Sequence, residues 1–483
     1  MEKKYIVGID EGTTNARAVL YDVKKKEIIK QESKNFKQFY PNPGWVEHDA
    51  EEIYKAVESC LNTVLEGLSA EEIYGIGITN QRESVVAWNK KTGKPAQKSI
   101  VWQCRRTEKY CESLSPKLKK IIKKKTGLIV DAYFSASKMK WMLENSEKVR
   151  TLNSENNLCF GTIDSFLLFK LTNGKVFATD VTNASRTMLF NINTLSWDSE
   201  LLKVFGIKLE SLPKVVSNSE ILGMAKTAIG EIPIASMIGD QQSALFGQGC
   251  FYEGMAKDTF GTGCFLLKNF GAKPPFSKNL LTDIAWKIGD NTTYALEGSV
   301  FNAGSAITWL VENIGVISSP KETNDIDKKA PTNLGVYFIP AFTGLGAPHW
   351  RGEVRGSITG LTRGTNKYHI VRACLESMVY SSQDILNEMG EISELRCDGG
   401  VTNSDFLLQF LADLSRIKVT RQKSVEATVL GAIYLAGLAT GAFKNLEEIS
   451  GLIKPAKTFL PKMHPDKMKE YYDGWKKALE HLY

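Results

Sequence analysis

Three aspartates in this sequence stand in the same local setting, at the end of a short apolar run and close to glycine. Asp240 follows Gly239 after the run from Ile232 to Ile238, Asp10 ends the first apolar run of the chain, and Asp398 precedes two glycines. Such runs are typical of buried strands, and in open α/β sheets ligands bind just outside the carboxyl ends of the strands. A carboxylate there has access to a substrate. It also suits Mg2+, a hard ion that binds few carboxylates together with phosphate oxygens and water.

A helix cap is the alternative interpretation of Asp240, because Ser243 to Phe246 begin like a helix. Most aspartates at such a position are caps, and for this stretch alone the cap is favoured. The repetition of the strand, acid and glycine pattern in three places favours a ligand site.

Two further segments could bind phosphate. The segment from Asp10 to Arg17 begins a strand–turn–strand hairpin, whose glycine permits a tight bend. Its backbone N–H groups and the hydroxyls of Thr13 and Thr14 can converge on an anion, and Gly261-Thr262-Gly263 forms a second such loop. The chain contains no GxxxxGKS, GxxxxGKT or GxGxxG motif. It therefore gives no support to a P-loop NTPase or a dinucleotide-binding fold.

An arginine and a glutamate, Arg82 and Glu83, follow the strand predicted at residues 76–79. They could form a surface ion pair of little energetic value. They could equally bind hydroxyl groups, because arginine donates hydrogen bonds and a carboxylate accepts them. The surface pair is the simpler interpretation of these residues alone.

The composition is that of an ordinary globular protein. The 483 residues are 43% hydrophobic and 24% charged, and no apolar run is long enough to cross a bilayer. The chain begins without an apolar signal segment, and its eight cysteines form no CxxC pair, so we expect a cytoplasmic protein with reduced thiols. The net charge of +7 suits a small anionic substrate but does not indicate nucleic acid.

The length predicts two domains, because one hydrophobic core rarely serves so long a chain. The character of the sequence changes after Gln248, where a turn leads into a strand-rich region. We therefore predict an N-terminal domain at residues 1–248 and a C-terminal domain at residues 249–483. The lysine-rich segment 117–125 is interpreted as a solvated amphipathic helix and not as a nucleic-acid or membrane surface.

Taken together, the motifs resemble those of the FGGY family of sugar and polyol kinases. They are Asp-x-Gly-Thr-Thr, Asn-Gln-Arg-Glu, Gly-Asp-Gln-Gln, Phe-Gly-Thr-Gly and Asp-Gly-Gly, in this order, with further blocks at 43–49, 101–107, 182–187 and 342–348. The resemblance extends from about Tyr5 to Trp475. It implies an α/β fold of two actin-like (ribonuclease H-like) ATPase domains flanking a catalytic cleft.

The resemblance also implies roles for single residues. Asp240 would be the general base that takes the proton from the alcohol being phosphorylated, and Asp10 would face Mg2+. The residues implied around the hydroxyls and carbon atoms of glycerol are Arg82, Glu83, Trp102, Tyr133, Asp240, Gln241 and Phe265. The residues implied around the phosphates and adenosine of ATP or ADP are Thr13, Thr14, Asn15, Arg17, Thr262, Gly304, Thr308, Gly400 and Ser404.

The implied activity is the ATP-dependent phosphorylation of glycerol to sn-glycerol 3-phosphate, by a homodimer or homotetramer. A kinase for another small polyol or a ketose is the first alternative, and residues 80–83 favour glycerol. An actin-like ATPase that acts as a chaperone or scaffold is the second. Glu11, Thr308 and Ser404 differ from the residues usual in the family, and we expect them to alter contacts with ATP. The loops at 229–234 and 461–469 give no sign of the regulatory sites of some relatives.

Overall fold

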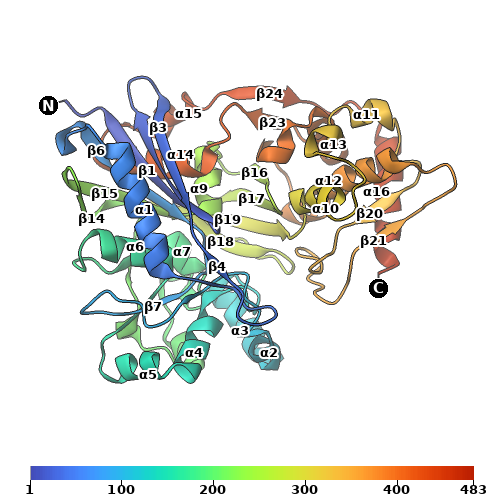
Figure 1. Cartoon of the computed structure of the whole chain (residues 1–483). Helices are drawn as coiled ribbons and strands as arrows, with labels where there is room; N and C mark the ends of the chain where they lie inside the picture. Colours follow the sequence, from blue (N-terminus) through green and yellow to red (C-terminus); the bar gives the residue numbers. More distant parts are fainter. Residues whose placement is uncertain (1, 483) are drawn as a thin grey trace.

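The computed structural model describes residues 2–482, which form two lobes, each built on one large β-sheet (Figure 1). The sheet of the first lobe has six strands, and the sheet of the second has seven. In order across the first sheet, the strands are β14 (Ser219–Thr227), β15 (Gly230–Gly239), β6 (Ile73–Asn80), β1 (Tyr5–Glu11), β2 (Asn15–Asp22) and β3 (Glu27–Asn35). In order across the second, they are β18 (Leu281–Ile288), β19 (Asn291–Val300), β17 (Cys264–Gly271), β16 (Met255–Phe260), β22 (Glu394–Asp398), β23 (Val419–Gln422) and β24 (Pro455–Phe459).

The two sheets share the same arrangement of their four central strands. Each begins with antiparallel neighbours, β1 with β2 and β16 with β17, and then adds two parallel strands beside the first. Strands β6 and β15 run parallel to β1, as β22 and β23 run parallel to β16. The carboxyl ends of these parallel strands therefore face the same edge of each sheet. The predicted α/β fold of two lobes is confirmed.

Helices cover both faces of the first sheet, which is why β1 and β6 are apolar over most of their length and polar only at their carboxyl ends. Helices α1 (Ala50–Leu65) and α6 (Ile163–Leu171) share a core with one face. Helix α14 (Ala427–Thr440), from the second half of the chain, packs on the other face beside α9 (Asp240–Gly247). This core combines residues from both halves, so the boundary between residues 248 and 249 stays a prediction.

The remaining helices and small sheets complete the lobes (Figure 1). Helices α2 to α5 and α8 form the outer part of the first lobe, whereas α10 to α13 and α16 belong to the second. The bounds of the other helices are α2 (Glu108–Ser113), α3 (Pro116–Thr126), α4 (Ser135–Asn145), α5 (Glu147–Ser154), α7 (Val181–Ser185), α8 (Ser199–Phe205), α10 (Gly304–Glu312), α11 (Ile326–Lys329), α12 (Lys367–Met389), α13 (Asp405–Ser415), α15 (Leu446–Ser450) and α16 (Pro465–Glu480). The short strands are β4 (Gln38–Phe39), β5 (Glu47–His48) and β8 (Ser99–Ile100) in one sheet, and the pairs β7 (Val86–Asn89) with β9 (Leu158–Gly161), β10 (Ala178–Asp180) with β13 (Lys214–Val216), β11 (Phe190–Asn191) with β12 (Ser196–Trp197) and β20 (Tyr337–Ile339) with β21 (Ser357–Thr359). Between residues 2 and 482, no helix is long and apolar enough to cross a membrane.

Glycines allow α9 and α14 to cross with their backbones in contact. A Cβ atom added to Gly247 would lie 1.9 Å from the carbonyl oxygen of Ala427, and one added to Gly431 would lie 2.0 Å from that of Ser243. Both obstacles are backbone atoms, which cannot rotate away. Because α9 begins with Asp240, this close crossing fixes the position of that aspartate.

We predict that Gly431→Ala lowers the melting temperature, although alanine favours a helix more than glycine does. The clash with the Ser243 carbonyl should cost about 2 kcal/mol or more and displace α9. The measurement is thermal unfolding followed by circular dichroism, with Gly352→Ala as the control, because an added Cβ there meets no atom within 4 Å. Equal melting temperatures for the two variants would contradict the prediction.

Candidate functional site

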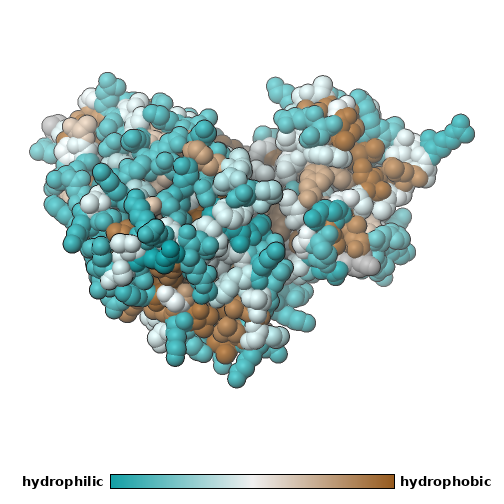
Figure 2. Space-filling model, turned by 60° about the horizontal axis from the view of Figure 1, so that its bottom comes forward, coloured by the Kyte–Doolittle hydropathy of each residue, from teal (hydrophilic) through white to brown (hydrophobic). Residues whose placement is uncertain are grey.

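The ends of β1, β6 and β15 lie side by side at one edge of the first sheet. In the strand register, Glu11 of β1 pairs with Asn80 of β6, and Asn80 pairs with Gly239 of β15. Asp10, the segment after Asn80, and Asp240 are therefore neighbours, although they lie far apart in the sequence. The surface view shows a hollow between the two lobes (Figure 2).

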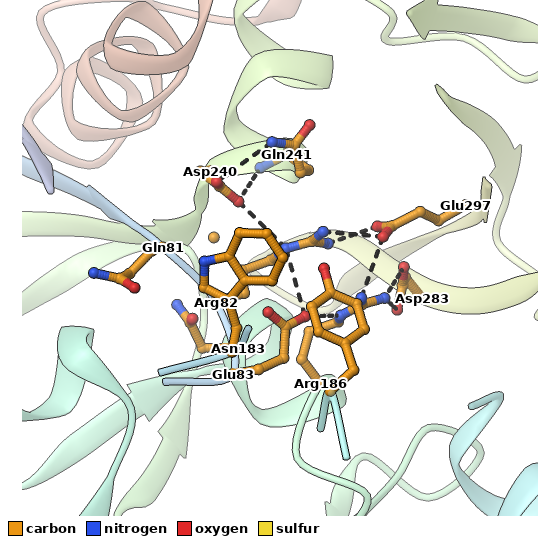
Figure 3. Close-up of polar contacts among 12 residues, drawn as sticks. Gln81, Arg82, Glu83, Asn183, Arg186, Asp240, Gln241, Asp283 and Glu297 are labelled. Atoms are coloured by element: carbon orange, nitrogen blue, oxygen red, sulfur yellow. Dashed lines mark hydrogen bonds and ion pairs between the residues drawn. The ribbon is translucent and has the colours of Figure 1, made fainter. Parts of the chain in front are cut away.

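Asp240 is the first residue of α9, and Gly239 occupies the cap position. Among residues 2–482, the carboxylate accepts hydrogen bonds from its neighbour Gln241 alone, 2.7 Å from its backbone N and 3.3 Å from Nε2. The side chain is 31% exposed, and Oδ1 lies 3.3 Å from Nε of Arg82 (Figure 3). The helix-cap interpretation is therefore wrong, and the carboxylate can reach a ligand.

Arg82 and Glu83 are not a surface pair, since their exposed fractions are 3% and 1%. Arg82 donates a forked pair of hydrogen bonds to Glu297, with Nη1 2.6 Å from Oε2 and Nη2 2.9 Å from Oε1. Glu83 accepts a hydrogen bond of 2.5 Å from Nε of Arg186. Arg186 in turn donates to both oxygens of Asp283, at 2.9 and 2.8 Å.

These five side chains form a buried ion cluster (Arg82, Glu83, Arg186, Asp283 and Glu297), shown in Figure 3. Arg186, Asp283 and Glu297 were missed in the sequence, because each is separated from its partner by about 100 residues or more. A signal was present all the same. Asp283 and Glu297 lie in the buried parts of their strands, where an ionised side chain needs a partner.

The pKa values in the cluster reflect burial and pairing. Burial raises the pKa of Glu297, but the Arg186 and Arg82 guanidinium groups outweigh it and hold the pKa below its ordinary value. Burial raises the pKa of Asp283 to about 7, against the opposing effect of Arg186. Burial lowers the pKa of Arg82, yet the carboxylates of Glu297 and Glu83 reverse the shift, and the arginine stays charged.

Aromatic side chains lie beside the ion cluster, as the sequence indicated. The ring centroids of Trp102 and Tyr133 are 5.6 Å apart, and the Arg186 guanidinium lies 5.4 Å from the Tyr133 ring. The indole N–H of Trp102 donates to Oγ1 of Thr13 at 3.1 Å, which links these aromatic side chains to the loop after β1. Phe265 of β17 is half-buried and pairs with Ser299 of β19 in the strand register.

A buried lysine, Lys257 of β16, approaches the same place from the second lobe. Its Nζ donates to Oε1 of Gln241 at 2.5 Å and to Oγ1 of Thr259 at 3.0 Å. Burial lowers the pKa of Lys257, although Asp398 opposes that shift. Sequence analysis missed this residue, because a single lysine in a strand carries no motif.

The loop after β1, residues 12–14, and its flanking residues line a cavity of about 580 Å³, together with residues of β3. Arg17 donates to Asp10 at 3.1 Å and pairs with Glu426 of the second half at 2.5 Å. Burial raises the pKa of Asp10 despite the opposing charge of Arg17. Asn15 lines this cavity, and the neighbouring Thr14 is exposed.

Glu11, which was expected to alter contacts with ATP, does not face solvent beside this loop. It is fully buried, and Oε1 accepts a hydrogen bond of 2.8 Å from Gln81. Burial raises the pKa of Glu11 well above its ordinary value. The correction follows from the β-strand itself, in which Asp10 and Glu11 point to opposite faces.

The second predicted loop lies in the second lobe, next to the start of α10. The carbonyl oxygen of Thr262 accepts hydrogen bonds from Ala303 and Ser305, and that of Gly261 accepts one from Gly304. A Cβ added to Gly304 would lie 2.6 Å from the Gly261 oxygen, so this approach requires glycine. The loop and α10 therefore form one rigid unit.

The other candidates for the nucleotide lie around this unit. An added Cβ at Gly400 meets no atom within 4 Å, so the backbone there is open. The Thr308 hydroxyl donates to the Gly304 carbonyl within α10, and Ser404 caps α13 by accepting from the Leu407 backbone N at 3.4 Å. Both hydroxyls thus have partners inside their own helices, and contacts of Thr308 and Ser404 with ATP stay a prediction.

The donors present fit Mg2+ bound chiefly through a nucleotide. Among residues 2–482, no group of three or more His, Cys, Asp or Glu side chains could hold a metal ion alone. Mg2+ is commonly bound through one or two carboxylates, with water and phosphate supplying the other ligands. Burial and the nearby Asp240 charge both disfavour the ionised form of Asp10 and raise its pKa. A cation at Asp10 would offset this cost, so the carboxylate is suited to that role.

Comparison with known proteins identifies relatives along the chain. The model of the FGGY family of carbohydrate kinases, N-terminal domain, matches residues 5–247, and that of the C-terminal domain matches residues 256–440. A glycerol kinase from Francisella philomiragia is 48% identical over 493 residues, which cover 99% of each chain.

Two solved structures are similar to the whole molecule. The crystal structure of Plasmodium falciparum glycerol kinase with ADP has a TM-score of 0.93 and 39% identity, and the match covers 100% of this chain and 99% of that one. A xylulose kinase from Lactobacillus acidophilus has a TM-score of 0.88 at 24% identity over 99% and 97% of the two chains, which supports the fold alone. The lobes thus have the predicted actin-like ATPase fold, and the chain belongs to the FGGY family of carbohydrate kinases.

Proposed function

We propose that the protein transfers the γ-phosphate of ATP to glycerol and forms sn-glycerol 3-phosphate and ADP. The observation that carries the proposal is the Asp240 carboxylate, which is partly exposed at the end of β15 and adjacent to Arg82. The similarity to glycerol kinases along the whole chain supports the same reaction. Expression in the cytoplasm and assembly as a homodimer or homotetramer remain expectations.

Glycerol is uncharged, so recognition requires hydrogen bonds to its hydroxyl groups. Arg82 supplies donors, and Glu83, Asp240 and Gln241 supply acceptors. Trp102 and Tyr133 provide aromatic surface for the carbon atoms, with Phe265 on the side of the second lobe. An analogue that lacks a hydroxyl would leave one of these polar groups unpaired, which is a strong source of discrimination.

The proposed chemistry requires one proton transfer and one displacement. Asp240 takes the proton of a terminal hydroxyl as the hydroxyl oxygen attacks the γ-phosphorus of ATP. The bond from that phosphorus to the bridging oxygen breaks, and ADP leaves with the electron pair. Phosphoryl transfer needs little covalent help from a protein, so alignment and charge neutralisation supply most of the catalysis.

Asp10 would hold Mg2+, and Arg17 and the N–H groups of Thr13 and Thr14 would face the phosphates. When bound, Mg2+ neutralises charge on the phosphate oxygens. Arg17 now pairs with Glu426 and Asp10, so an incoming phosphate would compete for its guanidinium. Thr262, Gly304 and Gly400 would approach the nucleotide from the second lobe.

A kinase for a different polyol or a ketose is the first alternative, and an actin-like ATPase without an alcohol substrate is the second. A coupled ADP-release assay over three- to six-carbon polyols and ketoses separates them. Alcohol-dependent ADP release with glycerol as the best substrate supports the proposal. Equal ADP release without any alcohol would contradict it.

We predict that Asp240→Asn lowers kcat for glycerol by roughly 100-fold or more, because the amide cannot accept the proton. Glycerol should still bind, since the amide keeps the shape of the side chain. Initial rates and calorimetric binding measure the two effects. The control is Asp466→Asn, which removes an exposed carboxylate at the start of α16. Unchanged turnover in Asp240→Asn would remove this residue from its proposed role.

We predict different responses at two adjacent acids. Asp10→Asn should raise the Mg2+ concentration needed for half-maximal activity by roughly tenfold, because a metal ligand loses its charge. Glu11→Gln should change it less than about twofold, because burial already favours the neutral form of Glu11. Titration of activity with Mg2+ measures both. Equal shifts in the two variants would refute the assignment of Asp10.

A further inference from the structure

We propose that Glu297 and Asp283 are positioning residues for the hydroxyl-binding pair, Arg82 and Glu83, although both come from the second half of the chain. The inference rests on the proposed function and adds residues that the motifs do not contain. Neither carboxylate is exposed, so each acts through an arginine.

The forked contact with Glu297 determines which edge of the Arg82 guanidinium faces the ligand. Glu297 accepts from Nη1 and Nη2, and a second Nη1 proton goes to Oε1 of Gln242 at 3.1 Å. An arginine has five N–H donors, so Nε–H and one Nη2 proton remain. They lie on the same edge, and Nε is 3.3 Å from Oδ1 of Asp240. A hydroxyl bound at that edge lies next to the proposed base.

Glu83 is oriented in the same indirect way. Its Oε1 accepts from Arg186, which leaves Oε2 for a hydroxyl of the ligand. The backbone of Glu83 has φ +60°, a conformation that is costly for a side-chain-bearing residue and persists only when its surroundings hold it. Ser135 supplies one such contact by donating to the Glu83 carbonyl at 3.1 Å.

Arg186 connects Glu83 of the first lobe to the second lobe through hydrogen bonds to both sides. It donates two hydrogen bonds to Asp283, and its Nη2 lies 3.2 Å from Oε1 of Glu297. Asp283 and Glu297 belong to β18 and β19, which are neighbouring strands of one sheet. The two arginines of the first lobe are thus held by one rigid hairpin of the second.

The place where this hairpin meets the first lobe is packed with apolar side chains. Val181, Ala184 and Ile192 of the first lobe share a small core with Ile284 and Tyr294 of β18 and β19. Arg186 follows directly after α7, which contributes to this core. Arg82 and Glu83, the proposed hydroxyl-binding pair, are therefore held next to a packed contact between the two lobes.

This arrangement predicts a selective defect. Without the Glu297 charge, Arg82 loses the partner that fixes its guanidinium, and its hydrogen bonds to hydroxyls become misdirected. Among the described residues, no hydrogen bond or ion pair of the ion cluster involves the nucleotide candidates Thr262, Gly304 and Gly400. The affinity for glycerol should fall while that for ATP is preserved.

The test is Glu297→Gln, which keeps the shape of the side chain and removes its charge. We expect the KM for glycerol to rise roughly tenfold or more and the KM for ATP to change less than about twofold. Glycerol binding, measured by calorimetry, should weaken by the same factor. Glu297→Asp, which keeps the carboxylate on a shorter stem, should give an intermediate KM for glycerol.

The matched control is Glu376→Gln, because Glu376 is equally buried and pairs with Arg372 at 2.6 Å in the second lobe, outside the ion cluster. It should leave the KM for glycerol unchanged. If Glu297→Gln fails to fold, Asp283→Asn serves as the second variant, with the same selective rise expected through Arg186. An unchanged KM for glycerol, or an equal rise in both KM values, would overturn the inference.

Wild-type turnover with glycerol is measured first, so that two failures can be told apart. Its absence would overturn the proposed function together with the inference. Turnover in the wild type with a normal KM for glycerol in Glu297→Gln and Asp283→Asn would overturn only the positioning role.

Discussion

The requirement that a buried charge be paired governs the centre of this molecule. Moving an ion out of water costs several kcal/mol, and removing one partner of a buried pair leaves that cost uncompensated. Here Arg82 and Arg186 come from the first lobe, whereas Asp283 and Glu297 come from the second. Neither set of charges could be buried alone. The arginines of the first lobe and the carboxylates of the second therefore neutralise each other at the place where the ligand is expected.

Topology explains why functional side chains meet there. Parallel strands β1, β6 and β15 end at the same edge, so residues separated by up to 230 positions become neighbours through the strand register. The close crossing of α9 and α14 then holds the start of α9 in place. Backbone geometry positions Asp240, and the buried ion cluster positions the arginine beside it.

Much of this arrangement was predictable from the sequence, and the physical reasons for the rest are clear. Apolar runs that end in an acid and glycine identified the strand ends at Asp10, Asp240 and Asp398, because these signals are local. The partners of Arg82 were not predictable, since Glu297 is 215 residues away.

Local patterns also mislead where burial determines the chemistry. Glu11 was expected to alter contacts with ATP, yet it is fully buried and accepts a hydrogen bond from Gln81. The Ser404 hydroxyl also caps α13, a contact that the sequence alone did not indicate, while its contact with ATP stays a prediction. Conversely, Lys257 looks like an ordinary strand residue, although it reaches Gln241 from the other lobe. The environment of a side chain decides these cases, and environment depends on the folded structure.

The two ends of the site differ in how their charges are held, and this difference suits the proposed substrates. At the hydroxyl end, the arginines have close, buried carboxylate partners, so they can orient an uncharged ligand without attracting stray anions. At the phosphate end, Arg17 is more exposed and shared between Asp10 and Glu426, so its partners can change when a phosphate arrives. In the proposed reaction, the rigid, neutralised end would select the alcohol, and the adaptable end would accommodate the charged phosphoryl donor. Arg186 lies beside the apolar contact between β18, β19 and the first lobe, whereas the more exposed pair of Arg17 with Glu426 forms a second link between the two halves of the chain.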